Sequence, residues 1–227
     1  MMFDNRKMFM KAFVSWSGGK DSCLACYRAL KNGVDISFLL TMLDEKGLRS
    51  KSHGLKKKIL EAQAKAVEKP IIYKETSWEN YEEKFKEAIK QLKKFGVEAG
   101  VFGDLRLLEH KKWVENVCNE VGIKALEPLW NENYKKIIDE FFSYGFEAII
   151  ISVKSNLISE EWLGQSFNEK FIEYLKSINV DLLGENGEYH TLVTYGPIFK
   201  KRVEIIKSKK NQINNYNILN IIKVNLK

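Results

Sequence analysis

The sequence predicts an α/β protein: a doubly wound parallel sheet with helices on both faces, followed by a smaller α+β part. Three observations predict this fold. Short strand-like segments alternate with amphipathic helix-like segments through the first half of the chain. The segment ISFLLTML, residues 36–43, is continuously apolar, as buried parallel strands usually are. A glycine-rich turn follows the first strand-like segment and leads directly into a helix-like one.

The first half of the chain supplies the expected parallel sheet and its helices. We expect strands over residues 9–16, 36–43, 71–73 and 99–104, where apolar and β-enriched residues gather. We expect helices over residues 21–31, 55–67, 80–94 and 113–121, where apolar side chains recur at helical spacing. Gly33, Gly96 and Gly122 mark the ends of three of these helices.

The pattern changes after Glu127, and we place a domain boundary between residues 127 and 128. The segment EPLW at this point reads as a hinge. Beyond it we expect helices over 134–144 and 166–177, a strand over 147–153, and a loop, GENGEYHT, over 184–191. The last residues read as two strands joined by a polar turn.

The composition is that of an ordinary soluble globular protein, with 44% hydrophobic and 30% charged residues. No apolar run approaches the roughly 20 residues of a membrane span. The first residues, MMFDNRKMFMK, lack an apolar stretch of signal-peptide length. We therefore expect a cytoplasmic protein without a membrane partner. Three cysteines, an odd and low count, imply no disulfide framework. Cys23 and Cys26 share one face of the first helix with apolar neighbours, so we expect them in the core.

The net charge of +7 belongs to the C-terminal tail. Residues 200–227 hold eight Lys/Arg and one acid, Glu204, which accounts for the whole excess. A nucleic-acid enzyme would more often spread positive charge around its site, so we do not expect a nucleic-acid partner. The tail is either a solvated basic hairpin or a contact for an acidic partner.

The glycine-rich turn, Ser17–Ser22, has the sequence SGGKDS. It is not a Walker A loop, because Val14 and Asp21 stand where that motif needs glycine and Ser/Thr. It still favours an anion, since a helix start offers free N–H groups and Lys20 adds a positive charge. The carboxylate of Asp21 would repel phosphate unless a cation such as Mg²⁺ bridges them. The alternative is a plain glycine turn with a helix cap.

SGGKDS between a strand and a helix is similar to the signature of the N-type ATP pyrophosphatases. Further segments narrow the family: RSKSHG (49–54), EAQAKAV (61–67), VFGD (101–104), VENVC (114–118), PLW (128–130), EWLG (161–164) and GENGEYHTLVTYGPIF (184–199). In this order, over nearly the whole chain, they resemble the diphthine–ammonia ligase family. The resemblance implies the PP-loop ATPase (HUP) fold, with residues 1–127 as nucleotide-binding domain and 128–227 as substrate-binding domain.

The resemblance also implies the reaction. The family adenylates the carboxylate of diphthine, a modified histidine on elongation factor two, and couples it to ammonia while ATP becomes AMP and pyrophosphate. ATP and Mg²⁺ are the implied cofactors. The implied ATP-binding residues are Ser15, Ser17, Gly18, Gly19, Lys20, Asp21, Ser22, His53, Gly103 and Asp104. Lys20 and Asp21 are also candidate catalytic residues, and Asp21 and Asp104 are candidate Mg²⁺ ligands. Asp104 could instead cap a helix, and His53 could be a solvated loop histidine.

The loop GENGEYHT is the candidate second site, for carboxylate and amine. Glu185, Glu188 and His190 are candidate catalytic residues, able to attract ammonium or to take its proton. The candidate substrate-binding residues are Trp130, Trp162, Gly184, Asn186, Tyr189 and Thr191. We expect the aromatic ones to form a partial cage for the trimethylammonium group of diphthine. Without the resemblance, the loop reads as a plain exposed turn and the aromatic residues as core.

One segment departs from the family's form. Where the family carries an acidic residue, a Tyr-Gln pair and an arginine, this chain has Arg106, Glu109-His110 and Trp113 at the same spacing. Two alternatives therefore stay open: a related ATP-dependent amide ligase acting on another carboxylate, and a tRNA-modifying or non-catalytic ATP-binding relative. The sequence is compatible with a homodimer and leaves the oligomeric state open.

Overall fold

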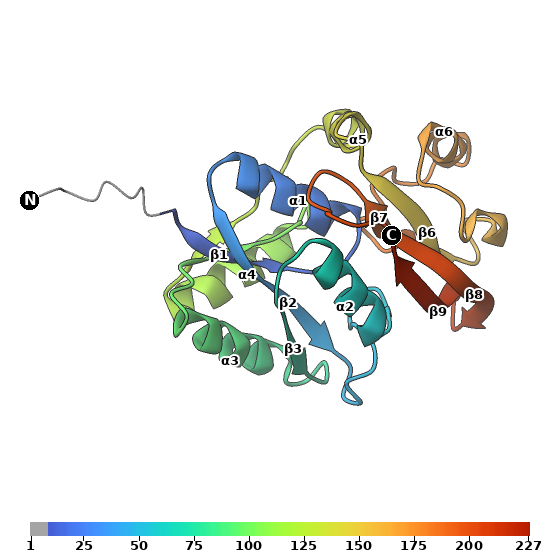
Figure 1. Cartoon of the computed structure of the whole chain (residues 1–227). Helices are drawn as coiled ribbons and strands as arrows, with labels where there is room; N and C mark the ends of the chain where they lie inside the picture. Colours follow the sequence, from blue (N-terminus) through green and yellow to red (C-terminus); the bar gives the residue numbers. More distant parts are fainter. Residues whose placement is uncertain (1–8) are drawn as a thin grey trace, which may run out of the picture.

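The computed structural model describes residues 9–227. The chain forms two sheets, one from each half of the sequence (Figure 1). The expectation that the chain begins without a signal sequence rests largely on residues 1–8, which lie outside the described residues. In the described part, no helix combines the length and the apolar character needed to cross a membrane.

The first sheet is parallel throughout and has the strand order β3-β2-β1-β4-β5. Its strands are β1 (Lys11–Ser15), β2 (Asp35–Leu43), β3 (Ile71–Glu75), β4 (Ala99–Val101) and β5 (Lys124–Leu126). The strand order reverses between β1 and β4. The carboxyl ends of these two strands therefore border the crevice in which open α/β sheets bind ligands.

Helices cover both faces of this sheet, so the predicted doubly wound architecture is confirmed. Helices α1 (Lys20–Lys31) and α2 (Lys57–Ala66) pack on one face, where their apolar residues share a core with Val14 and Leu39. Helices α3 (Tyr81–Lys93) and α4 (Leu108–Val121) pack on the other face, around Phe13 and Leu40. Successive residues of β1 and β2 thus point to opposite faces, as the strand geometry requires.

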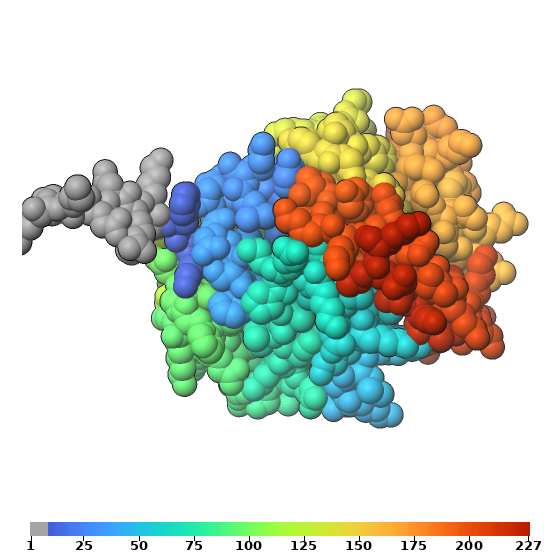
Figure 2. Space-filling view, in the orientation of Figure 1, coloured from blue at the N-terminus to red at the C-terminus, as the bar shows by residue number. Residues whose placement is uncertain are grey.

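The second sheet is antiparallel and has the order β7-β6-β9-β8. Its strands are β6 (Glu147–Lys154), β7 (Tyr189–Tyr195), β8 (Val203–Ile213) and β9 (Tyr216–Leu226), and its helices are α5 (Tyr134–Ser143) and α6 (Glu169–Ser177). Strands β8 and β9 form the predicted C-terminal hairpin. Strand β9 packs against α2 of the first half, and the red hairpin lies directly beside the teal segment (Figure 2).

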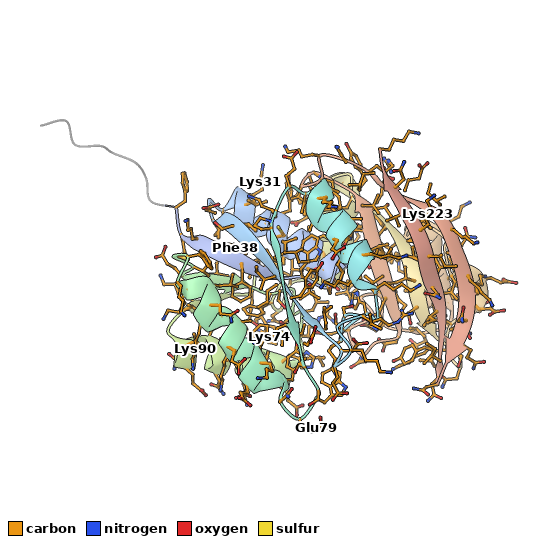
Figure 3. All side chains as sticks on the ribbon, turned by 60° about the horizontal axis from the view of Figure 1, so that its bottom comes forward. Lys31, Phe38, Lys74, Glu79, Lys90 and Lys223 are labelled. Carbon is orange, nitrogen blue, oxygen red and sulfur yellow. The ribbon has the colours of Figure 1, made fainter. Side chains whose placement is uncertain are left out.

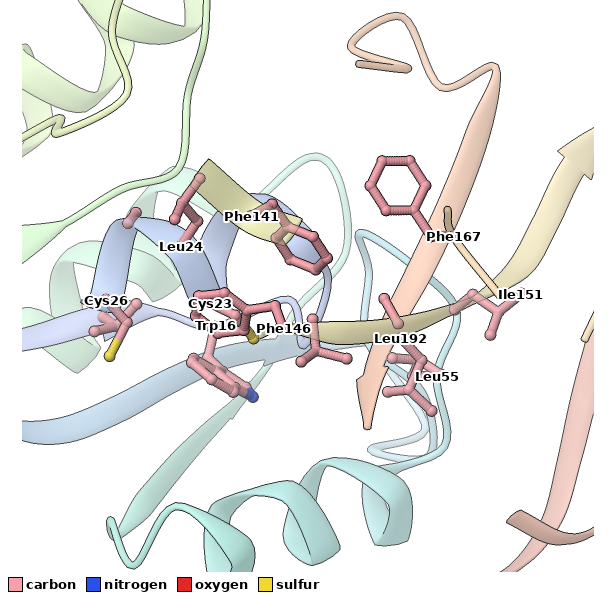
Figure 4. Packing of buried hydrophobic residues seen from close by; sticks show 14 of the residues in the cluster. Trp16, Cys23, Leu24, Cys26, Leu55, Phe141, Phe146, Ile151, Phe167 and Leu192 are labelled. Carbon is pink, nitrogen blue, oxygen red and sulfur yellow. The ribbon is translucent and has the colours of Figure 1, made fainter. Parts of the chain in front are cut away.

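A single hydrophobic core joins the two halves. One buried cluster contains Trp16, which directly follows β1, together with Cys23 of α1, Phe141 of α5 and Leu192 of β7 (Figure 4). The guanidinium of Arg28 on α1 adds a polar link, because it donates to the carbonyl of Pro128 at 2.7 Å. The domain boundary at residues 127/128 stays a prediction.

Several expected element bounds differ from the structure: the helix expected from residue 113 begins at Leu108 as α4, and the strand expected over 99–104 ends at Val101 as β4. Strand β5 was not expected, because it has only three residues. The helix expected from residue 166 begins at Glu169, since Asn168 caps it by accepting a hydrogen bond from the amide of Phe171 at 3.2 Å. The segment GENGEYHT is a loop only as far as Glu188. Its last three residues open strand β7, where they pair with β6.

The three cysteines are free and buried, as expected for core residues. Burial raises the pKa of the Cys26 thiol to about 12, so this thiol is unreactive at neutral pH.

Lys31, Lys90 and Lys223 lie exposed on the outside of the molecule (Figure 3). Strand β8, an edge strand, carries the exposed Lys207, Lys209 and Lys210. Lysines on an edge strand oppose pairing with another chain. This position favours the solvated-hairpin interpretation of the basic tail.

Candidate functional site

The glycine-rich turn connects the end of β1 to the first residue of α1, at the crevice of the parallel sheet. Gly18 has a φ of +78°, and a Cβ on it would lie 2.3 Å from Oε1 of Gln63. Gly19 caps the helix, and a Cβ there would lie 2.5 Å from the ring of His53. Glycine is therefore required at both positions, by strain and close contact at Gly18 and by close contact alone at Gly19.

Groups from outside the turn hold its backbone in place. The amide of Lys20 donates to Oγ1 of Thr191 at 3.0 Å, and the amide of Val193 donates to the carbonyl of Gly18 at 3.0 Å. Gln63, fully buried on α2, donates to the carbonyls of both Gly18 and Val193. Strand β7 and helix α2 thus fix the turn together. Sequence reasoning missed Gln63 as a site residue, although it lies in the quoted segment EAQAKAV.

The hydroxyls of the turn bond within the turn itself. Oγ of Ser17 accepts from the amide of Gly19 at 3.3 Å and lies 3.1 Å from Oγ of Ser22. Ser15 is the last residue of β1 and pairs with Leu40 of β2. These serines shape the turn, and they do not line the cavity next to it.

A polar cavity of about 150 Å³ opens beside the turn. Ten of the predicted site residues line it: Lys20, Asp21, His53, Gly103, Asp104, Gly184, Glu185, Tyr189, His190 and Thr191. The structure thus brings the SGGKDS turn, the end of β4 and the GENGEYHT segment to one place. Leu105, Leu107 and His110 complete the lining. His110 belongs to the segment that departs from the family's form, and its Nδ1 lies 3.5 Å from Oδ1 of Asp104.

Lys20 is the one Lys or Arg among the residues that line this cavity. Its side chain is largely buried, with Nζ 2.8 Å from the carboxylate of Asp21 and 5.3 Å from the centre of the Tyr189 ring. Nζ also donates to the carbonyl of Leu183 at 2.5 Å. These contacts hold the ammonium group at one point of the cavity wall.

Asp21 and Asp104 place two carboxylates in the same cavity. Burial raises the pKa of Asp21, while Lys20 lowers it. Burial also raises the pKa of Asp104, while His110 lowers it. Both groups therefore resist carrying their charges without a counter-ion. Carboxylates are ligands that Mg²⁺ commonly takes together with substrate phosphates, so the chemistry of these two side chains suits that ion. No group of three or more His, Cys, Asp or Glu that could hold a metal occurs among the described residues.

We expect the Asp104→Asn variant to be more stable than the parent chain at pH 8. A carboxyl group whose pKa is raised on folding disfavours the folded state once it ionises, so stability falls as the pH rises through that range. The amide removes this penalty, and its advantage shrinks at pH 5, where more of Asp104 is protonated. Urea denaturation at both pH values measures the effect. A variant that is less stable at pH 8 would contradict this account.

His53 and His190 stack with ring centres 4.3 Å apart. Burial and the nearby Lys20 lower the pKa of His190 to about 4, and burial followed by His190 lowers the pKa of His53 well below its usual value. Both rings are therefore neutral at pH 7. His190 is a weak base in this setting, which does not favour the predicted transfer of a proton from ammonium. Nδ1 of His53 is buried and has no hydrogen-bond partner in the described residues.

The stacked histidines also border a second, larger cavity of about 330 Å³. It lies between the segment 49–59 and strands β6 and β9, with mainly apolar walls and with Arg49 and Lys56 as its charged lining residues. The two cavities therefore adjoin at His53 and His190.

The two predicted catalytic glutamates lie in different places. One carboxylate oxygen of Glu185 accepts from the amides of Leu105, Arg106 and Leu107 at 3.2, 2.5 and 3.0 Å. Glu188 is largely buried, accepts from the amide of Asn186 at 3.0 Å, and does not line the polar cavity. Glu188 and Asn186 therefore stabilise the loop 184–188 through this hydrogen bond and do not line the polar cavity.

The predicted aromatic cage does not form among the described residues. The ring of Trp162 packs against Phe171 and Tyr174, and Lys111 lies over the ring of Trp130. Of the three rings expected in the cage, only Tyr189 lines the polar cavity. The core alternative describes Trp162 better, because its neighbours belong to the packing of α6.

Comparisons with known proteins cover nearly the whole described chain. The family model of the diphthamide synthase N-terminal domain matches residues 10–125, and that of the C-terminal domain matches residues 133–226. A diphthine–ammonia ligase of Schizosaccharomyces pombe is 27% identical, over 86% of this chain and 36% of its own length. Those of Rattus norvegicus and Homo sapiens are 27% and 26% identical, each over 85% of this chain and 82% of its own length. The chain thus spans about a third of the fission-yeast relative and most of the mammalian ones.

A solved structure described as a predicted subunit of tRNA methyltransferase from Methanocaldococcus jannaschii is also similar. It is 17% identical, covers 83% of this chain and 98% of its own, and superposes with a TM-score of 0.47. This distant likeness does not bear on function. The two family models together match most of the chain, and the chain therefore belongs to the diphthamide synthase family.

Proposed function

We propose that this chain is an AMP-forming ligase that adenylates the carboxylate of diphthine and couples it to ammonia. The observation that carries the proposal is the polar cavity in which Lys20, two aspartates and the GENGEYHT segment meet. The names of the relatives supply the acceptor, because they describe diphthine–ammonia ligases that match most of this chain. Family membership supplies ATP as the second substrate.

The first step, adenylation of the carboxylate, requires groups that bind the leaving pyrophosphate. A carboxylate oxygen of the acceptor attacks the α-phosphorus, and the bond from that phosphorus to the β-bridging oxygen breaks. The electron pair leaves with pyrophosphate. Lys20 would stabilise the charge that develops on this leaving group, because its ammonium is fixed in the cavity wall. Asp21 and Asp104 would hold Mg²⁺, which supplies further charge neutralisation when it is bound.

The second step uses the acyl adenylate as its electrophile. The nitrogen of ammonia attacks the carbonyl carbon, the carbon–oxygen bond to AMP breaks, and the attacking nitrogen loses a proton. Asp21 and Asp104 would be engaged with Mg²⁺, and His190, whose pKa is about 4, is a weak base, so the proton would pass to water. The acidic cavity also attracts ammonium from solution.

The proposal extends to the protein partner, the compartment and the oligomeric state. The protein partner is elongation factor two carrying diphthine, reached without a nucleic-acid or membrane partner. The site of action is the cytoplasm, where that factor works. A homodimer is compatible with the proposal, and none of the cavity contacts described above requires a second copy.

Product analysis tests the proposed reaction. The chain is incubated with ATP, Mg²⁺, ammonium and diphthine-bearing elongation factor, and we expect AMP and pyrophosphate only when this acceptor is present. Unmodified elongation factor is the matched control and should give no AMP. ADP as the product would contradict the pyrophosphatase chemistry. AMP release that depends on transfer RNA, or on another carboxylate, would contradict the acceptor.

A further inference from the structure

We propose that Glu185 is a positioning residue, which fixes the segment 104–107 at the cavity and does not exchange a proton with the amine. This inference rests on the proposed function for its kinetic test. It replaces the role that the sequence suggested for Glu185, proton transfer to or from ammonium, with a mechanical one.

The contacts of the Glu185 side chain carry the inference. A single oxygen, Oε1, accepts hydrogen bonds from three successive amides, those of Leu105, Arg106 and Leu107. These amides precede the first residue of α4, Leu108, so the carboxylate also faces the positive end of that helix. Successive amides that converge in this way form a concave donor site for a negative oxygen. Three donors on one oxygen hold the carboxylate of Glu185 in one place against the segment 105–107.

The backbone on the other side of Glu185 is also fixed. Its amide donates to the carboxylate of Asp181 at 3.0 Å. Two residues earlier in the chain, the carbonyl of Leu183 accepts from Nζ of Lys20. Between them, Gly184 has a φ of +68° and lies against the ring of Tyr189, where a Cβ would come within 2.7 Å of the ring. Glu185 thus connects two fixed parts of the cavity wall.

The position of Asp104 depends on this connection. Asp104 directly precedes the three amides in sequence, and its carboxyl lines the cavity together with that of Asp21. The segment 104–107 joins β4 to α4, and no other side chain accepts a hydrogen bond from its amides among the described residues. Loss of Glu185 therefore leaves the segment held by the buried side chain of Leu105 and by the bond from the amide of Asn131 to its carbonyl, and we expect Asp104 to shift in the cavity.

Two variants of Glu185 separate positioning from proton transfer. Glu185→Gln keeps an acceptor oxygen at the same place but cannot take up a proton at neutral pH, whereas Glu185→Ala removes the acceptor. Displacement of a reacting group by about 1 Å costs on the order of 100-fold in rate. We expect Glu185→Ala to lose about that much in kcat for amide formation. We expect Glu185→Gln to recover activity to within about tenfold of the parent, with the same pH profile. A glutamine variant as inactive as the alanine variant would overturn the inference.

Hydrogen exchange gives a second test that does not depend on any ligase activity. In the parent chain and in Glu185→Gln, we expect slow exchange of the amides of Leu105, Arg106 and Leu107, and in Glu185→Ala at least about tenfold faster exchange. Amides within α3 serve as the internal control for global folding. Unchanged exchange at the three amides in Glu185→Ala would overturn the inference. If no acceptor supports AMP formation, the proposed function fails, and the exchange result still decides the role of Glu185.

Discussion

Replacement of Lys20 by methionine is expected to lower kcat/KM for AMP formation by about 100- to 1000-fold, as loss of a preorganised charge donor does in other enzymes. Lys20 is the one Lys or Arg lining the polar cavity, and the two neighbouring histidines are neutral at pH 7. The cavity lining of the variant therefore has no lysine or arginine to oppose the charge on departing pyrophosphate. Steady-state measurement of AMP release gives the effect.

Lys31→Met is the matched control, because Lys31 ends the same helix but is exposed. Its activity should equal that of the parent. Loss of Lys20 also leaves the carboxylate of Asp21 without its partner, which destabilises the fold. The double variant Lys20→Met/Asp21→Asn removes that charge and should regain stability without regaining activity. A Lys20→Met variant with full activity would contradict the proposed role.

Replacement of Gly18 by alanine is expected to have the second large effect, on both stability and activity. A φ of +78° costs a non-glycine residue about 1–2 kcal/mol. The added Cβ would also lie 2.3 Å from Oε1 of Gln63, which must shift and disturb its hydrogen bonds to the turn. We expect a loss of about 3 kcal/mol in the free energy of unfolding, from strain and damaged buried hydrogen bonds together. AMP formation should fall with it, because the turn that carries Lys20 moves.

Gly145→Ala separates strain from the clash. Gly145 has a φ of +75° and nothing within 4 Å of an added Cβ, so only the backbone strain is introduced. Denaturation of both variants should show a smaller loss for Gly145→Ala, with normal AMP formation. Equal losses in the two variants would show that the contact with Gln63 does not matter.

Much of the fold could be predicted because its segments carry strong periodic patterns. The apolar run of β2, the amphipathic stripe of α3 and the two strands of the C-terminal hairpin all appear where the pattern placed them. Strand β5 has three residues, too few for any period to show. Strand β7 begins inside a glycine-rich segment, so its first residues read as part of a turn.

The candidate site was predictable where motifs mark it and not where contacts alone define it. Lys20, Asp21 and Asp104 lie in recognisable segments, and the topology of parallel strands brings them together. The aromatic cage failed because a sequence does not show which tryptophans share a cavity, and Trp162 packs within the core around α6. Gln63 acts through contacts with Gly18 and Val193, which lie far from it in sequence, and the sequence of its own helix does not show these contacts.

The central claim is that this cavity joins ammonia to the carboxylate of diphthine, and mass spectrometry of the acceptor tests it most directly. Diphthine-bearing elongation factor is incubated with the chain, ATP, Mg²⁺ and isotopically labelled ammonium, and the modified peptide is sequenced by fragmentation. The account predicts conversion of the acid to the amide, with one labelled nitrogen at the diphthine carboxyl and one AMP formed for each conversion. An acceptor that stays an acid while AMP accumulates on another substrate would contradict it.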